Sequence, residues 1–178
     1  MRPEQLVIYR HLAHALRGRR VVDVGCGIGI GTNVLAYWGC QVVGTDIEPG
    51  HVGFARAIYP ELSFAVWDIC RGPIVLAGGG RADAAVAVEV IEHVEAAEAV
   101  TRHLLASAPR VYLSTPNRAN PMLGQESPLN QFHVREYTPA EVLDLLGRPA
   151  TIRDPFSWRV VGSESLMTPL VYEVGDAR

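Results

Sequence analysis

Two kinds of segment alternate along most of this chain. Short, continuously apolar runs predict strands that are buried on both faces of a sheet. Between them, apolar residues recur every three or four positions, which predicts amphipathic helices. The first helix begins at Pro3, and its apolar face comprises Leu6, Tyr9, Ala13 and Leu16. This alternation predicts a doubly wound α/β domain with a parallel sheet between two layers of helices.

The expected elements follow one another without an internal repeat or a linker. The strands are expected at 21–25, 40–46, 62–69, 82–88 and 110–114, followed by a hairpin-like pair at 158–165 and 170–174. Helices are expected at 31–37, 50–59 and 95–106. A last helix has its own start signal, because Thr138 caps it, Pro139 opens it and Glu141 completes a capping box. The whole of 1–178 is therefore expected to form a single domain.

Composition narrows the class of protein. The chain has 178 residues, of which 48% are hydrophobic and 20% charged, as in ordinary globular domains. No apolar run approaches the ~20 residues of a membrane helix, and the N-terminal stretch, with Glu4, lacks the apolar centre of a signal peptide. The three cysteines, Cys26, Cys40 and Cys70, form no CxxC pair. We therefore expect a cytoplasmic protein with reduced thiols and no membrane association.

Charge argues against a nucleic-acid partner. The formal net charge is −3, and the chain contains no lysine. Arg17, Arg19 and Arg20 form the only tight basic cluster, and no basic stripe with interleaved aromatic residues follows. We therefore do not expect a nucleic-acid substrate. We expect a protein that acts on a small molecule, as a monomer or a homodimer.

The clearest chemical signal is the stretch RRVVDVGCGIGIGT at 19–32, where glycines end the first strand. Glycines allow the backbone to approach a ligand closely. The dinucleotide pattern G-x-G-x-x-G is absent, because Ile30 and Thr32 occupy the places of its third glycine in the two possible registers. A phosphate loop is excluded by the missing lysine. The remaining turn contains Gly25, Gly27 and Gly29.

Carboxylates accompany the expected ends of three successive strands. Asp23 comes two residues before the first glycine, Asp46 ends the second strand, and Asp68 ends the third. A carboxylate at the end of the second strand can accept hydrogen bonds from a ribose diol. Three acids at one sheet edge suit a cofactor that has a cationic group and no phosphates.

The segment from about Val21 to Asn117 resembles the class I S-adenosylmethionine-dependent methyltransferases. The resemblance implies a Rossmann-like, seven-stranded sheet that is mostly parallel, with one antiparallel C-terminal strand, in three αβα layers. It also implies a cofactor-binding core at 19–115, preceded by the N-terminal helix at 1–18. A substrate loop at 116–137 and a helix with the final strand pair at 138–178 would complete the domain.

Carried over residue by residue, the resemblance assigns the cofactor site. The glycine turn would approach the methionine moiety of S-adenosylmethionine, with Asp23 close by. Asp46 would hold the ribose hydroxyls, Asp68 the adenine, and Ile47 and Ile69 would flank the adenine ring. The complete expected set of cofactor-binding residues is Asp23, Gly25, Cys26, Gly27, Gly29, Asp46, Ile47, Asp68, Ile69 and Glu89.

The end of the fourth strand favours a small-molecule acceptor. It reads Glu89-Val90-Ile91-Glu92-His93, whereas methyltransferases of nucleic-acid bases have an Asp/Asn-Pro-Pro-aromatic box here. The pattern is similar to the branch that acts on small molecules, sugars, lipids and quinone precursors. His93 is a candidate general base for a hydroxyl acceptor, because its pKa suits proton transfer near neutrality. The alternative is a packing role at the start of a helix.

The same residues also allow a metal site. Glu89, Glu92 and His93 stand at i, i+3 and i+4, and His133 follows the fifth strand. Two carboxylates and two imidazoles can hold a divalent ion. The spacing is similar to that of the small-RNA 3′-end ribose 2′-O-methyltransferases, although the chain is short and lacks a basic surface signal. Hydrogen bonding at the strand edge is the expected role of these groups, and no metal is expected.

The long segment 116–137 shows neither helical nor strand periodicity, so a substrate-covering loop is expected there. His133 in this loop is the second candidate catalytic residue. The sequence thus predicts a methyltransferase that acts on a hydroxyl or amine of a small molecule or sugar-containing metabolite. Two alternatives stay open, a metal-dependent RNA ribose methyltransferase and a non-catalytic scaffold that binds the cofactor for a partner enzyme.

Overall fold

The computed structural model describes residues 1–121 and 130–175 and contains one seven-stranded sheet in the order β3-β2-β1-β4-β5-β7-β6. Its strands are β1 (Arg20–Val24), β2 (Gln41–Asp46), β3 (Ser63–Val66), β4 (Ala84–Val88), β5 (Arg110–Thr115), β6 (Thr151–Arg153) and β7 (Leu170–Val174). Its helices are α1 (Pro3–Ala15), α2 (Ile30–Tyr37), α3 (Pro49–Ile58), the 3-10 turn η1 (Ile91–His93), α4 (Ala97–Ser107) and α5 (Pro139–Leu146).

Pairing within the sheet confirms the expected doubly wound topology. Strands β1 to β5 pair in parallel, and β7 is antiparallel to both β5 and β6. The strand order reverses between β1 and β4. In open sheets of this kind, ligands bind outside the carboxyl ends of the strands at such a reversal. The topology therefore directs attention to the ends of β1 and β4.

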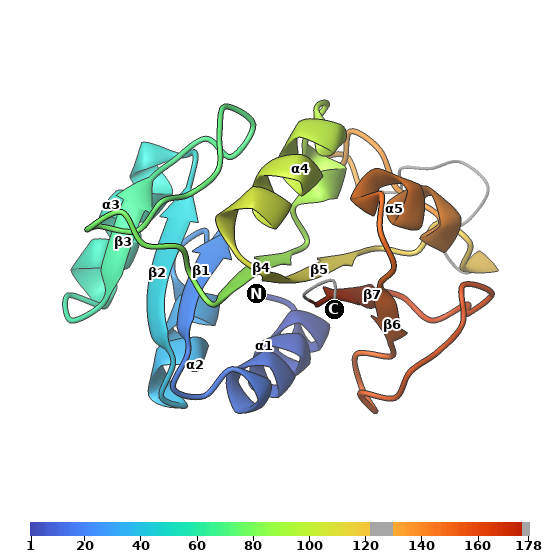
Figure 1. Ribbon diagram of the computed structural model, residues 1–178, viewed down its shortest axis with the longest axis horizontal. Coiled ribbons are helices and arrows are strands. Elements are labelled where there is room, and N and C mark those ends of the chain that lie inside the picture. Colours follow the sequence, from blue (N-terminus) through green and yellow to red (C-terminus); the bar gives the residue numbers. More distant parts are fainter. Residues whose placement is uncertain (122–129, 176–178) are drawn as a thin grey trace.

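Helices cover both faces of the sheet, so the core has two main parts (Figure 1). On one face α4 and α5 pack on strand residues such as Val22 and Leu113. On the other face α1 and α2 pack on alternate strand residues such as Val21 and Tyr112. Neighbouring residues of one strand thus enter opposite cores, which explains why these strands are apolar throughout.

Two strand predictions need correction. The penultimate strand is β6, at Thr151–Arg153, and not 158–165. The Asp154 carboxylate accepts hydrogen bonds from the Phe156 and Ser157 amides and so closes a turn, and Trp158 beyond it has φ 59°. The expected strand therefore contributes only a single bridge, between Val160 and Arg153.

The third strand is shorter than the predicted 62–69, because β3 ends at Val66. Asp68 lies beyond its end, where its carboxylate accepts a hydrogen bond from the Cys70 amide at 2.9 Å and pairs with Arg71 at 3.1 Å. These local bonds close a turn in place of the last strand residues. Asp68 is therefore held in a turn after the strand and does not end it.

Candidate functional site

The glycine turn connects the end of β1 to the start of α2. Gly25, Gly27 and Gly29 have φ angles of 69°, 54° and 84°, which favour glycine. A Cβ atom on Gly25 would lie 2.7 Å from Cγ2 of Val90, so this position has no room for a side chain. Beside the turn is a cavity of about 210 Å³, lined by Gln5, Tyr9, Gly25, Cys26, Gly27 and Glu89 among others.

Asp46 fixes the turn from the neighbouring strand. Its Oδ2 accepts a hydrogen bond from the Gly27 amide at 2.8 Å, and its Oδ1 accepts one from the Glu48 amide at 2.9 Å. His51 approaches the same Oδ1 at 3.4 Å. The Asp46 carboxylate thus lies between the glycine turn and the start of α3, at the place expected for the group that binds a ribose.

Asp23 lies beneath the turn and is fully buried. Its carboxylate accepts hydrogen bonds from the Tyr9 hydroxyl at 2.9 Å and the Thr32 hydroxyl at 2.6 Å. Burial raises its pKa to about 6, against the lowering effect of these two bonds. Asp23 is completely enclosed, whereas Asp46 keeps 9% of its surface exposed, so Asp23 supports the turn from the protein side and ties it to α1 and α2.

The other expected cofactor residues take different positions. Ile47 is 64% exposed beside Asp46, whereas Ile69 is buried in the core under α4. Cys26 is buried within the turn, and burial raises the pKa of its thiol, so the thiol stays neutral. Of the ten expected residues, the structure places Gly25, Cys26, Gly27 and Glu89 on the cavity wall.

Glu89 lies where two cavities meet. It also lines a second cavity of about 440 Å³, together with Arg2, Glu4, Asn130, His133 and Glu136 among others. Its Oε2 accepts a hydrogen bond from the Arg2 guanidinium at 2.6 Å, and its Oε1 accepts one from the Ser114 hydroxyl at 3.2 Å. Burial raises the pKa of Glu89 to about 7, although the charge of Arg2 lowers it.

The backbone at Glu89 is also unusual. Its φ is 59°, which is uncommon for a residue with a long side chain. Such conformations persist where the surroundings hold them, and they gather at functional sites. The strained backbone, the buried carboxylate and the junction of two cavities therefore coincide in one residue.

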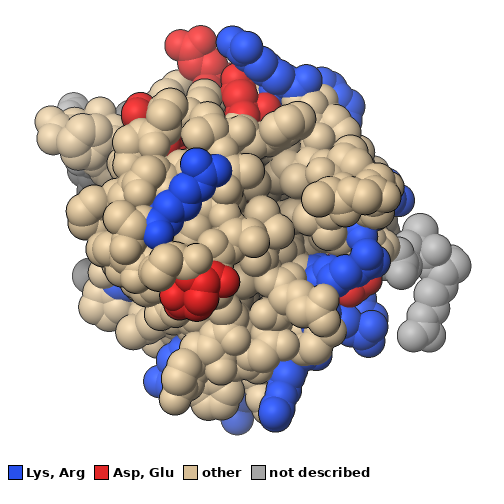
Figure 2. Space-filling view, turned by 90° about the vertical axis from the view of Figure 1, so that its left-hand side faces the viewer, with Lys and Arg blue, Asp and Glu red and all other residues tan. Residues whose placement is uncertain are grey.

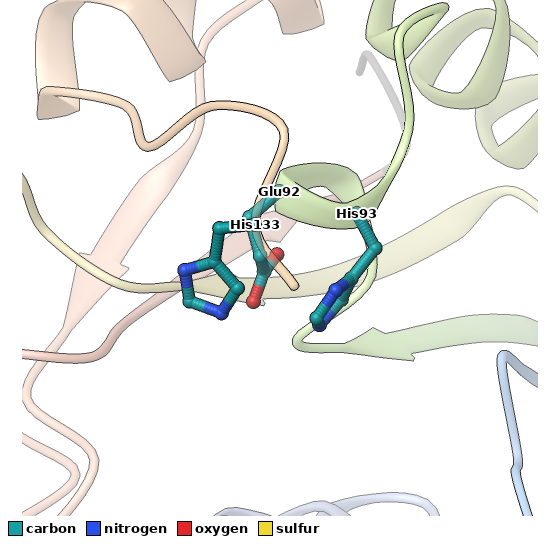
Figure 3. A group of neighbouring side chains, drawn as sticks. All are labelled: Glu92, His93 and His133. Atoms are coloured by element: carbon teal, nitrogen blue, oxygen red, sulfur yellow. The ribbon is translucent and has the colours of Figure 1, made fainter. Parts of the chain in front are cut away.

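Two imidazoles, of His93 and His133, lie close to each other beside Glu92 (Figure 3), and His133 lines the larger cavity together with Glu89. The rings of His93 and His133 meet edge to face, with centroids 4.9 Å apart. His93 Nδ1 donates a hydrogen bond to the Phe132 carbonyl at 2.9 Å, and His133 Nδ1 donates one to Glu136 Oε1 at 2.8 Å. Partial burial lowers the pKa of His93, so the neutral ring is favoured. The structure thus joins the two candidate catalytic histidines in one group.

Glu92 completes this group from η1. It is fully buried, and its Oε2 accepts a hydrogen bond from the Thr115 hydroxyl at 3.1 Å. Its backbone carbonyl accepts a bond from the Val134 amide at 2.7 Å and so holds the segment with His133 in place. Ligand atoms of Glu92, His93 and His133 all lie within 4.8 Å of one another. Glu89, the fourth candidate ligand, is bound to Arg2 and Ser114 and is outside this group.

The sequence interpretation missed the contribution of α1. From the sequence, Pro3 indicated only the start of a helix and Tyr9 only its apolar face. In the structure, Arg2 just before this helix binds Glu89, and Tyr9 within it binds Asp23. Arg2 and Glu89 are 87 positions apart in the chain. No local pattern reports such a pair, although an arginine just before a helix that packs near the switch point was an available signal. Residues 122–129 of the expected substrate loop lie outside the described residues.

In the part of the chain that the structure describes, none of the helices combines the length and apolarity needed to cross a membrane.

Comparisons with known proteins agree with this architecture. The family model described as a methyltransferase domain matches residues 5–148. A probable S-adenosylmethionine-dependent methyltransferase of Mycolicibacterium smegmatis is 36% identical over 143 residues, covering 79% of this chain and 54% of that protein. A ubiquinone biosynthesis O-methyltransferase of Azorhizobium caulinodans is 35% identical over 96 residues, covering 49% of this chain and 38% of that protein. The chain spans about half the length of the mycobacterial relative.

The fold itself is also found in solved structures. The CcbJ methyltransferase from Streptomyces caelestis superposes with a TM-score of 0.79 at 13% sequence identity, covering 98% of this chain and 91% of that chain. Identity at this level shows the fold alone. The family match covers most of the chain, and it agrees with the sheet order and the glycine turn. The chain therefore belongs to the methyltransferase-domain family and has the class I methyltransferase fold.

Proposed function

We propose that this chain transfers a methyl group from S-adenosylmethionine to a hydroxyl or amine of a small molecule or sugar-containing metabolite. One observation carries the proposal: a cavity at the glycine turn and a larger cavity with charged residues in its wall share Glu89. Methyl transfer needs two ligands that meet in line at one point. The junction at Glu89 supplies such a point.

The donor side fits a cationic cofactor without phosphates. Backbone at Gly25 and Gly27 borders the first cavity, and Asp46 lies at the adjacent strand end. The Glu89 carboxylate at the cavity wall would face the positive sulfonium. We assign the methionine moiety to the glycine turn and the ribose to Asp46. In this assignment Asp23 positions the turn and does not touch the cofactor.

The acceptor side supplies groups that can activate a hydroxyl or amine. In the reaction, a lone pair on the acceptor attacks the methyl carbon, the carbon–sulfur bond breaks, and its electron pair stays on sulfur in S-adenosylhomocysteine. The acceptor proton must leave as well. His133 lines the acceptor cavity and contacts His93, so we propose that these two imidazoles activate the acceptor. The segment 116–137 would cover it.

A small polar acceptor fits the second cavity better than a nucleic acid. Its wall contains Glu4, Glu89 and Glu136 against the single arginine Arg2 among the described residues. Arg2 is paired with Glu4 and Glu89, so this wall offers no excess of positive charge to a phosphate backbone, which needs basic contacts. On the face beside α3 and β3, charged side chains are separated by uncharged surface (Figure 2). These observations support a metabolite with hydroxyl or amino groups.

Calorimetric titration of S-adenosylhomocysteine tests the donor side. We expect micromolar binding by the wild type and at least a tenfold loss in Asp46→Ala, because the variant lacks the carboxylate next to the turn. Glu61→Ala is the matched control, since Glu61 is an exposed acid just before β3, at the amino ends of the strands and away from the glycine turn. Loss of binding in both variants, or in neither, would contradict the assignment of Asp46.

Transfer of labelled methyl groups to a panel of acceptors then tests the reaction. The panel contains catechols, sugars, amines and short RNA ends. Turnover on a small hydroxyl or amine supports the proposal, and turnover confined to RNA ends supports the ribose methyltransferase instead. Cofactor binding without turnover, together with copurification of a second methyltransferase chain, would favour a scaffold.

A further inference from the structure

The buried carboxylate of Glu92 is incompletely satisfied. Its side chain is fully enclosed, and only Oε2 has a hydrogen bond, from Thr115. Within residues 1–121 and 130–175, Oε1 finds no hydrogen-bond partner. Buried acidic groups are normally hydrogen-bonded, paired with a cation or bound to a metal. Glu92 belongs to the group that contains His93 and His133, so its unpaired oxygen is available to a ligand of this group.

The two histidines have their lone pairs on the same type of nitrogen. His93 Nδ1 faces the Phe132 carbonyl, which only accepts hydrogen bonds, so this nitrogen has the proton and Nε2 has the lone pair. His133 Nδ1 faces Glu136 Oε1, and its Nε2 accepts a hydrogen bond from the Asn130 amide nitrogen at 2.9 Å, which a metal ion at Nε2 would replace. Metal-binding histidines typically donate their other ring N–H to a carboxylate or a backbone carbonyl. Both histidines have that partner.

We propose that Glu92, His93 and His133 bind one divalent transition-metal ion beside the acceptor cavity, of whose wall His133 forms part. One carboxylate and two imidazoles suit zinc, cobalt or iron better than magnesium or calcium. Bonds of about 2.1 Å to one ion place ligand atoms roughly 3–4 Å apart. The distances between the ligand atoms therefore need to shorten by about 1 Å, and a movement of the exposed His93 ring can supply this. Glu89 is not a ligand, because Arg2 and Ser114 hold its carboxylate.

Three protein ligands leave coordination positions open toward the cavity, as in catalytic metal sites. A bound ion lowers the pKa of a hydroxyl that coordinates it. The acceptor oxygen would thus lose its proton to solvent, attack the methyl carbon and leave the sulfur neutral. This role rests on the proposed function, whereas the metal site itself does not. It favours an acceptor with two adjacent oxygens, which can occupy both open positions.

Cobalt(II) titration of the chelator-treated full chain tests the site without any cofactor. We expect one ion per chain, visible absorption typical of low-coordinate cobalt, and a rise of the unfolding temperature with cobalt concentration. His93→Gln should weaken cobalt binding at least tenfold, and Glu92→Gln and His133→Gln should do the same. His14→Gln is the control, because His14 is an exposed histidine on α1 outside the group. It should bind cobalt like the wild type.

His93 is exposed, so its variant should fold even if the two buried substitutions do not. S-adenosylhomocysteine binding by His93→Gln should equal that of the wild type. Absence of cobalt and zinc binding by the wild type would overturn the proposal, as would binding that persists in His93→Gln. If cobalt binds at the site but S-adenosylhomocysteine does not bind the protein, the metal site stands and the proposed function fails.

Discussion

The two halves of the candidate site are built in different ways. The cofactor half, at the ends of β1 and β2, is made largely of backbone: the glycine turn, with Asp46 bonded to the Gly27 amide. The acceptor half, at the ends of β4 and β5, is made of side chains from distant segments: Arg2, Glu89, Glu92 and His133. The first is fixed by local sequence, and the second exists only after α1 and the segment around His133 have packed.

The halves also differ in how their buried charges are treated. In the cofactor half, both oxygens of Asp23 accept hydrogen bonds from protein hydroxyl groups, and the side chain serves to hold the turn. In the acceptor half, burial and the charge of nearby Glu89 raise the pKa of Glu92, and one of its oxygens has no partner among the described residues. A site that positions a ligand can be completed by the protein itself. A site that performs chemistry retains groups that the ligand has to complete.

The largest expected effect comes from Gly25→Ala, which breaks the cofactor half. The new Cβ would lie 2.7 Å from Val90 Cγ2 at a φ of 69°, beside the cofactor cavity. We expect affinity for S-adenosylhomocysteine, measured by calorimetry, to fall at least a hundredfold. Gly79→Ala is the control, because Gly79 has φ 79° and a Cβ there would meet nothing within 4 Å. Equal affinity of the two variants would show that the turn does not bind the cofactor.

The substitution Asp23→Asn removes the negative charge of the side chain beneath the turn and keeps a side chain of nearly the same size there. Because the pKa of Asp23 is raised from 3.8 to about 6 in the folded chain, the folded state binds more protons than the unfolded state between these values. Its contribution to stability is therefore present below pH 4 and is lost as the pH rises through 6. Relative to the wild type, the variant should gain about 2 kcal/mol in unfolding free energy between pH 4 and pH 6. Urea unfolding at several pH values measures this difference, and a difference independent of pH would contradict the raised pKa.

The smallest expected effect comes from Glu141→Ala at the capping box of α5. Burial acts to raise the pKa of Glu141, but hydrogen bonds from Thr138 and the nearby arginines hold it at about 2. Removing the carboxylate should lower the unfolding free energy by about 1 kcal/mol. S-adenosylhomocysteine affinity should not change, because α5 packs on α4 and contributes no residue to the wall of the cofactor cavity. A loss of cofactor affinity would mean that the two halves are coupled.

Local patterns predicted most of the fold. The apolar runs gave five parallel strands, and the capping box of Thr138, Pro139 and Glu141 is confirmed at the start of α5. The strand at 158–165 was wrong: its apolar residues Trp158, Val160 and Val161 are followed by Gly-Ser-Glu-Ser, and the Asp154 turn just before it interrupts the pairing. The true strand β6 has only three residues, too few to show a period.

The site divides in the same way. Gly25, Gly27 and Asp46 could be found because glycine spacing and strand ends are visible in short stretches of sequence. Glu92 and His93 are neighbours in the sequence, so their grouping could be predicted. The bond between Arg2 and Glu89 spans 87 positions and depends on how α1 packs. The sequence could therefore propose Glu89 as a metal ligand, but it could not show that an arginine already holds the carboxylate.

The backbone at Glu89, with φ 59°, has an evolutionary consequence. Asparagine and glycine adopt this conformation more readily than glutamate, so drift toward greater stability would replace Glu89 by one of them. Such replacements would remove the carboxylate at the junction of the two cavities. Under the proposed function, selection for activity opposes selection for stability at this position, and a redesign guided by stability alone would remove the proposed contact with the cofactor.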